Sequence, residues 1–308
     1  MTAALHVGLS GRFHLVKRRA SDDAIVETRE FANLITDAGL NRWGSGGVID
    51  RCLVGSGNTP PTVNDVQMGN RVATSTTIQN PAVTFAYSAA ERWQEYSTGY
   101  RFAAGSATGT LAEVGMGWAD TGLWSRALIR DTQGNPTSLT LLADEYLDVF
   151  YTVRLQYPST DVTGTVTLGG TNYAWAMRPI NIHTAQSWGT LFGYPLAGHS
   201  ASYEYANAYT GDLVAVANAT PTGDLSYFGG PYSVAAYVDG LGSGQFYRDF
   251  SATSGTTRNV GNIKTVVFTL SAPNGGRQVA WQCAFTPAIP KTSTQTLKLT
   301  LRVSWARA

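Results

Sequence analysis

The sequence contains few charged residues. Asp, Glu, Lys and Arg make up 14% of its 308 residues, well below the share of about a quarter that is usual in a globular domain. The 22 basic and 21 acidic residues leave a formal net charge of +1. No overall field therefore draws the chain to nucleic acid or to an anionic membrane. Because a free monomer normally stays soluble through its surface charges, this scarcity predicts that another protein covers part of the surface.

Cysteines and long apolar segments are also scarce. Cys52 and Cys283 lie far apart in the sequence; two buried free thiols are the favoured interpretation, and a single disulfide is the alternative. No run approaches the roughly 18 apolar residues of a membrane span. The N-terminal segment carries its basic residues after its apolar ones, unlike a signal peptide. We expect a soluble chain made in the cytosol, without membrane insertion.

Residues with catalytic or metal-binding potential do not form a recognisable site. Asp144, Glu145 and Asp148 resemble a carboxylate cluster, but adjacent residues on a strand point to opposite faces, so a turn-capping role is favoured. The four histidines show no pair at metal spacing: His6, His14, His183 and His199. A meeting of His183 and His199 is the alternative, and it would need further ligands. Neither a Gly-x-Ser-x-Gly nor a His-Glu-x-x-His motif occurs. We expect no enzyme, catalytic residue, metal or cofactor.

The best-defined strands lie in the middle and at the end of the chain. The segment 113–158 combines alternating runs with a turn at 133–136, where Gly134 accepts a positive φ and Pro136 lacks a donor. One apolar face follows this turn: Val149, Tyr151, Val153, Leu155 and Tyr157. A second one lies near the C-terminus: Leu297, Leu299, Leu301, Val303 and Trp305. This period of two predicts half-buried antiparallel strands.

The first part of the chain contains the single expected helix. Residues 5–19 alternate around a break at Ser10 and Gly11, which predicts a hairpin or a broken strand that ends in three basic residues on a solvated edge. Thr36 or Asp37 caps a short helix near 36–43. Residues 55–61 lack the Gly-Lys-Ser/Thr of a phosphate-binding loop, so we expect a structural loop there. The predicted fold class is all-β, with antiparallel, sandwich or jelly-roll-like sheets.

The composition changes after Pro158. Residues 159–262 are rich in Gly, Thr, Ser, Ala and Tyr, and strict alternation returns after Lys264. We therefore expect a β scaffold from residues 1–158 and 263–308, with 159–262 as an inserted or appended β domain. Aromatic rings stack on sugars and dominate protein hot spots, so we expect the recognition surface in this region, although each single ring is more typical of a core. The candidate binding residues are Trp188, Tyr194, Tyr203, Tyr205, Tyr209, Tyr227, Phe228, Tyr232, Phe246 and Tyr247.

Several phrases of the sequence resemble structural proteins of tailed bacteriophages and prophages. They are FANLITDAGL (31–40), VGSGNTPP (54–61), EVGMGW with LWSRALI (113–118 and 123–129), and FTPAIPKT with SWAR (285–292 and 304–307). The resemblance spans both ends of the chain and leaves 159–262 unmatched. It implies a virion protein of the tail, the baseplate or a tail fibre.

The expected partners follow from the same resemblance and from the composition. We expect the chain to assemble with itself, most simply as a trimer, because low charge and many aromatics favour self-association and closed rings avoid open-ended assembly. Neighbouring virion proteins are further expected partners, as is a glycan or protein of the host surface. A carbohydrate-binding receptor-recognition protein is one alternative. A glycan depolymerase is another, although the sequence shows no β-helix repeat.

Overall fold

Strands dominate the protein. The computed structural model describes residues 2–44, 49–79, 84–182, 205–217, 220–228, 233–234, 246–271 and 277–308. Their strands form antiparallel sheets, with one parallel pair between β1 and β21. The predicted all-β class is confirmed. Within the described ranges there is one helix, α1 (Asp37–Gly44), close to the predicted position.

Local chemistry explains where α1 begins and why it packs as it does. The Thr36 hydroxyl accepts the Gly39 N–H at 2.9 Å, so Thr36 is the N-cap that the sequence offered as one of two choices. Leu40 and Trp43 are buried. Gly39 lies directly against the backbone of Trp124, where a Cβ atom would clash. The helix therefore sits against the core through its glycine and its two large apolar residues.

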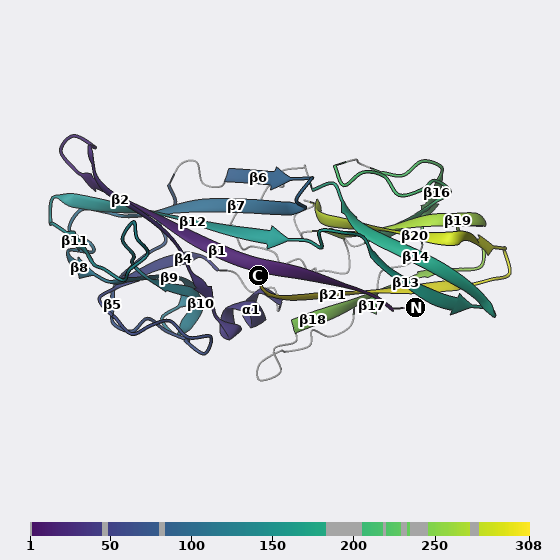
Figure 1. Ribbon diagram of the computed structural model, residues 1–308, viewed down its shortest axis with the longest axis horizontal. Coiled ribbons are helices and arrows are strands. Elements are labelled where there is room, and N and C mark those ends of the chain that lie inside the picture. Colours follow the sequence, from purple (N-terminus) through teal and green to yellow (C-terminus); the bar gives the residue numbers. More distant parts are fainter. Residues whose placement is uncertain are drawn as a thin grey trace.

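The largest sheet has eight strands in the order β17-β18-β21-β1-β12-β7-β6, with β2 also paired to β1. Figure 1 shows β1 crossing the molecule diagonally beside β12. The strands are β1 (Thr2–Arg19), β2 (Ile25–Ala32), β6 (Thr84–Ser88), β7 (Trp93–Phe102), β12 (Glu145–Gln156), β17 (Ser233–Val234), β18 (Phe246–Ser254) and β21 (Leu297–Arg307). Because β1 and β21 are neighbours, both ends of the described chain lie in one sheet.

The predicted break in residues 5–19 is wrong, since β1 runs without interruption through Ser10 and Gly11. Gly11 lies opposite Val153 of β12. A Cβ atom there would collide with the Tyr151 hydroxyl and the Asn33 side chain. The glycine therefore makes room for buried polar side chains and does not turn the chain.

A five-stranded sheet and a two-stranded sheet pack beneath the large one at the end of the molecule that holds β2 (Figure 1). Their orders are β3-β10-β9-β4-β5 and β11-β8. The strands are β3 (Leu34–Ile35), β4 (Arg51–Gly55), β5 (Arg71–Ser75), β8 (Gly109–Leu111), β9 (Glu113–Ala119), β10 (Gly122–Leu128) and β11 (Leu139–Leu141). The Trp124 Nε1–H donates to the Tyr151 hydroxyl at 2.8 Å, which joins β10 to β12 across the core.

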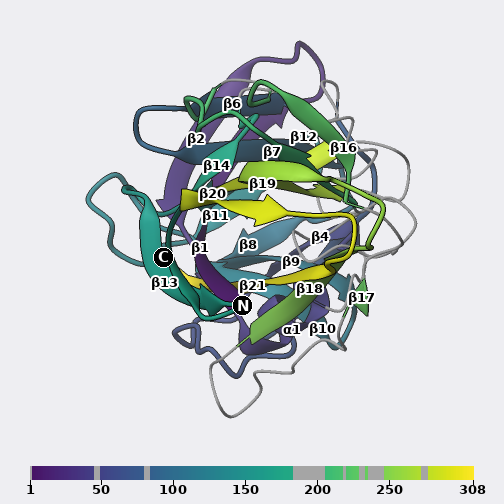
Figure 2. The same ribbon diagram turned by 90° about the vertical axis from the view of Figure 1, so that its right-hand side faces the viewer.

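A six-stranded sheet forms the other end of the molecule, as Figure 2 shows. Its order is β13-β14-β20-β19-β15-β16. The strands are β13 (Val162–Leu168), β14 (Thr171–Ile180), β15 (Tyr205–Tyr209), β16 (Asp224–Tyr227), β19 (Gly261–Ser271) and β20 (Arg277–Lys291). Phe268 and Phe285 of this sheet share one hydrophobic cluster with Leu299 of the large sheet.

The sheets divide the chain differently from the expected scaffold and insertion. β18, from the middle region, pairs with β21 in the large sheet. β19 and β20, expected in the scaffold, pair with β15 and β14 in the six-stranded sheet. The change of composition at Pro158 therefore does not separate the strands by sheet, because composition does not specify which strand is the neighbour.

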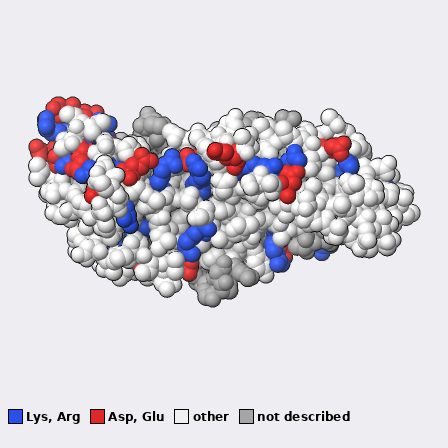
Figure 3. Space-filling model, in the orientation of Figure 1, with Lys and Arg blue, Asp and Glu red and all other residues white. Residues whose placement is uncertain are grey.

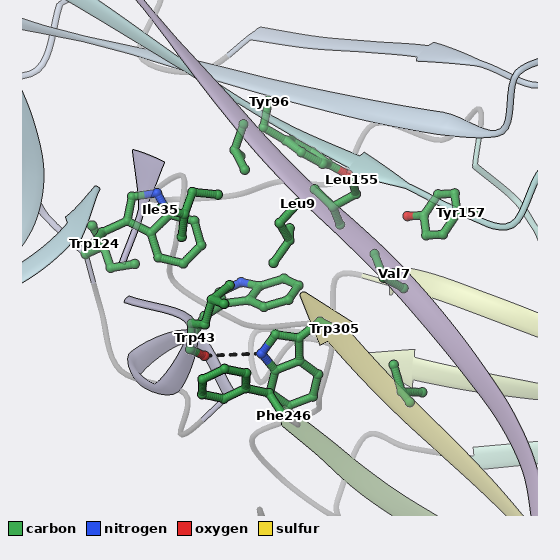
Figure 4. Close-up of a cluster of buried hydrophobic side chains, with 14 of the residues drawn as sticks. Val7, Leu9, Ile35, Trp43, Tyr96, Trp124, Leu155, Tyr157, Phe246 and Trp305 are labelled. Atoms are coloured by element: carbon green, nitrogen blue, oxygen red, sulfur yellow. Dashed lines mark hydrogen bonds between the residues drawn. The ribbon is translucent and has the colours of Figure 1, made fainter. Parts of the chain in front are cut away.

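Buried tryptophans connect α1 to β21 of the large sheet. The Trp305 Nε1–H donates to the Leu40 carbonyl at 3.2 Å, and the rings of Trp43 and Trp305 meet edge to face at 5.7 Å. Figure 4 shows this cluster together with Phe246 and Leu9. The predicted apolar faces of β12 and β21 both line the core. Cys52 and Cys283 are buried free thiols, which confirms the favoured interpretation.

Candidate functional site

The outer side of the large sheet collects polar side chains from five neighbouring strands. Every second residue of a strand points to this side. We call it the polar face, and its members include His6, Arg12, His14, Glu95, Ser97, Arg101, Asp148, Thr152, Arg154, Tyr247, Asp249, Thr300, Arg302 and Ser304. Figure 3 shows charged side chains of both signs where β1, β7 and β12 run. The signs alternate, so the polar face produces little net field.

Arg302 illustrates an arrangement that recurs on the polar face. Its guanidinium carbon lies 4.0 Å from the centroid of the Tyr247 ring. Its Nε and Nη2 donate to the two carboxylate oxygens of Asp249 at 2.7 and 2.8 Å. This hydrogen bonding raises the pKa of Arg302. Stacking and bidentate pairing together hold the guanidinium in one orientation.

A similar arrangement, an arginine stacked on a ring and bound to a carboxylate, occurs twice more, on β7 and β12. Arg101 is bidentate to Asp148, whereas Arg154 makes a single hydrogen bond to Glu95. The two sets are Arg154 with Trp93 and Glu95, and Arg101 with Tyr146 and Asp148. The guanidinium carbons lie 4.3 Å and 4.2 Å from the respective ring centroids. Arg154 and Glu95 are direct cross-strand partners, as are Arg101 and Asp148. Pairing in register thus builds an ordered surface from residues that are far apart in sequence.

Glu95 holds two of these arginines together. Its carboxylate accepts hydrogen bonds from Arg12 at 2.7 and 3.1 Å and from Arg154 at 2.7 Å. Burial raises the pKa of Glu95, but the hydrogen bonds from the two guanidinium groups outweigh burial and leave the pKa below its usual value. A general acid needs the opposite shift. The geometry therefore suits cohesion of the face better than proton transfer at Glu95.

Half of the predicted aromatic binding residues cannot be assessed from side-chain positions. Trp188, Tyr194, Tyr203 and Tyr232 lie outside the described residues. Tyr205 begins β15, and its side chain is not described. The predicted recognition loops therefore stay a prediction for these positions.

The other five predicted aromatic residues divide into core and surface. Tyr209, Phe228 and Phe246 are buried, with exposed fractions of 5%, 1% and 1%. In this conformation these three rings are core residues and offer no surface to a partner. Tyr227 and Tyr247 are half-buried, and each lies under an arginine, Arg258 at 5.9 Å and Arg302 at 4.0 Å. The sequence alone did not separate the two groups, because ring burial depends on the opposing sheet.

Glu113 organises the glycine-rich loop that follows β4. Its fully buried carboxylate accepts backbone N–H groups from Gly57, Gly69 and Asn70 at 3.1, 3.0 and 2.7 Å. The Arg126 Nε–H donates to it at 2.6 Å. The loop amides are thus bound to a carboxylate of the chain itself, which agrees with the expected structural loop.

Arg126 extends this buried network to the rest of the loop. It donates to Asp65 at 2.8 Å and to the Thr59 carbonyl at 2.9 Å. Burial raises the pKa of Glu113, but the amides of Asn70 and Gly69 and the Arg126 guanidinium outweigh burial and lower the pKa overall. Our sequence reasoning assigned Glu113 no role. One sequence feature could have indicated this role: β9 combines an acidic residue, Glu113, with apolar residues, and β10 contains a lone arginine, Arg126.

The basic and acidic clusters noted in the sequence bind each other. The Lys17 Nζ lies 3.6 Å from the Glu145 carboxylate and donates to the Thr140 carbonyl at 3.0 Å. The Glu145 carboxylate also accepts the Leu142 N–H at 2.9 Å, which is the expected turn-capping role. Asp148 is bound by Arg101. These residues link neighbouring strands and turns. They do not converge on a common point where a substrate atom could react.

A shallow depression of about 540 Å³ lies on the six-stranded sheet. Small side chains of β13, β14 and β20 line much of it, including Thr165, Ala174 and Thr286, and Lys264 pairs with Asp212 at 3.4 Å on its border. Among the described residues, no three His, Cys, Asp or Glu side chains are grouped to hold a metal ion. His183 and His199 lie outside those residues. No described helix has the length and apolar character needed to cross a membrane.

No family model, curated protein or solved structure matches this chain.

Proposed function

We propose that the protein is a structural component of a bacteriophage virion, located in the tail, the baseplate or a tail fibre. The phrases that resemble such proteins support the proposal: 31–40, 54–61, 113–118 with 123–129, and 285–292 with 304–307. Most of these segments lie where secondary-structure elements connect or pair. The first leads into α1, the second forms the loop that Glu113 binds, and the third comprises β9 and β10.

The observation that carries the proposal is an exposed surface without charge. From Val162 to Met177 the chain contains no charged residue, although Thr163, Thr165, Thr167 and Ala174 of this hairpin are exposed. The charges of the polar face, in contrast, neutralise one another in fixed pairs. A chain that functions alone usually spreads charge over its surface. An uncharged hairpin together with a sheet whose charges are paired is the kind of surface that packs against neighbouring proteins in an assembly.

The proposed partners are further copies of the chain, other virion proteins and a molecule of the host surface. A trimer is the simplest closed ring for a heterologous contact. Light scattering on the purified chain tests this part: a mass of three times 32.9 kDa, or a multiple of it, supports a ring of three chains. A stable monomer at high concentration would contradict self-association and would leave binding to other virion proteins as the route of assembly.

A carbohydrate-binding receptor-recognition protein is the competing role. Tyr227 and Tyr247 are the described candidate rings with exposed surface, but each is already covered on one side by an arginine. A glycan depolymerase would need a carboxylic acid with a raised pKa. Among the described carboxyl groups, Glu95, Glu113 and Asp161 instead have lowered values. We therefore rank the structural role first.

The proposal is tested on particles of the phage or prophage that carries the gene. We expect the chain to be present in purified particles and an antibody against it to label the tail, baseplate or fibre in negative-stain images. Particles from a strain with the gene deleted provide the matched control for the antibody. Absence of the chain from purified wild-type particles would refute the proposal.

A further inference from the structure

Within the part of the chain that the structure describes, strand β13 is an unprotected sheet edge. It ends the six-stranded sheet, pairs with β14 from Val162 to Leu168 without a bulge, and has no described strand on its other side. Figure 2 shows it at the rim of the molecule. The strand contains neither charge nor proline. Such an edge presents unpaired N–H and C=O groups that can pair with another strand.

The other described edges are shorter or are protected by charge. β2 carries Glu27, Arg29 and Glu30 along its length. β16 has four residues, begins with Asp224 and contains Ser226 at a φ of +72°. β5 begins with the charged Arg71. With seven residues, β13 is the longest uncharged edge strand in the described part of the chain.

The inward side chains of β13 are incompletely covered. Val162, Val166 and Leu168 pack on the hydrophobic core but remain partly exposed. The outward side chains, Thr163 and Thr165 among them, are exposed. A strand added beside β13 would bury more apolar surface on the inner side and would pair its backbone at the same time.

The sequence of β13 is complementary to itself. Residues 162–168 read Val-Thr-Gly-Thr-Val-Thr-Leu, with threonine at 163, 165 and 167. If two copies pair antiparallel around Thr165, Thr163 faces Thr167 and Val162 faces Leu168. Threonines then meet on the outer face and apolar residues on the inner face, and both combinations are favourable cross-strand pairs. No charge is buried or opposed in this register.

We propose that β13 binds β13 of a second copy of this chain, antiparallel across a two-fold axis at Thr165, so that the six-stranded sheets of two copies become continuous. Such a contact is isologous, because the same surface serves both partners. It rests on the geometry of the edge and is independent of the virion role. The ring of three proposed above uses a different, heterologous contact. The two-fold contact therefore predicts two chains where it acts alone and six where it joins two such rings.

Three variants measured by light scattering and sedimentation over a concentration series test the contact. T165K places two lysines opposite each other at the axis and should raise the dissociation constant several-fold, halving the mass at intermediate concentration. A174K is the matched control, because Ala174 is exposed beside Thr165 on β14 but is not on the edge. T163K/T167K opposes two pairs of lysines and should weaken association by about tenfold or more.

The charge-swapped variant T163K/T167E tests the register. In the proposed pairing each new lysine faces a glutamate of the other copy, so this variant should associate like the wild type and unlike T163K/T167K. Circular dichroism and thermal unfolding test that the variants, all at exposed positions, stay folded. A monomeric or trimeric wild type, or T165K with an unchanged mass, would overturn the proposal. Equal weakening by T163K/T167E and T163K/T167K would overturn the register.

Discussion

Replacing Glu113 by glutamine should destabilise the protein more than any other conservative change to a described carboxylate. The carboxylate is fully buried and accepts three backbone N–H groups and one guanidinium N–H. A glutamine offers one oxygen in place of two, and its amide nitrogen then faces donors. Arg126 would also keep its buried charge with Asp65 as its remaining anionic partner.

The expected cost follows from these contacts. Removing one partner of a buried ion pair typically costs about 3–5 kcal/mol, and buried donors left without an acceptor cost about 1–3 kcal/mol each. The loop 56–70 consists of turns and coil, and its backbone amides bind Glu113. Opening of the loop can therefore relieve part of the loss of stability. We therefore expect a loss of about 3–5 kcal/mol, a large part of the roughly 5–15 kcal/mol that stabilises a typical native protein.

Urea unfolding followed by tryptophan fluorescence measures this loss, since Trp124 is buried in the same sheet. E30Q is the matched control. The Glu30 side chain is 60% exposed and lies 3.3 Å from Arg12, so its replacement should change the free energy of unfolding by no more than about 0.5 kcal/mol. If E113Q unfolds at the same urea concentration as E30Q, the buried network does not hold the loop and our reasoning is wrong.

Three further predictions test other parts of the structure. Because the pKa of Glu113 is lowered in the folded state, its contribution should be complete above the unfolded value of about 4.3 and should be lost as the pH falls through the folded value. Thermal unfolding between pH 7 and pH 3 should show this loss in the wild type and a smaller one in E113Q. Burial raises the pKa of the Cys52 and Cys283 thiols, so a thiol reagent at pH 8 should label neither until urea unfolds the chain; rapid labelling of the native protein would contradict their burial. F228A should cost about 3–5 kcal/mol as a core truncation, whereas Y227A, which removes a half-buried ring, should stay folded and weaken adsorption or assembly; unchanged particle incorporation and infectivity would reject a role for Tyr227.

The class of fold and the buried side of the clearest strands could be predicted from the amino-acid sequence. The alternation at 149–157 and 297–305 specified which residues face the core, because the side-chain period of a strand is a property of the local backbone. Thr36 likewise located the start of the one described helix, since capping depends on residues within one turn. The low number of charges led to the expectation that another protein covers part of the surface, and this stays a prediction.

Which strands are neighbours could not be predicted from the sequence and became clear from the folded chain. β19 and β20 lie with β14 and β15, and β18 lies with β21, although composition had placed them otherwise. The burial of Phe228 and the anchoring of a loop by Glu113 follow from these pairings. Pairing between distant strands depends on the shape and register of two surfaces together, and neither strand's sequence contains that information alone.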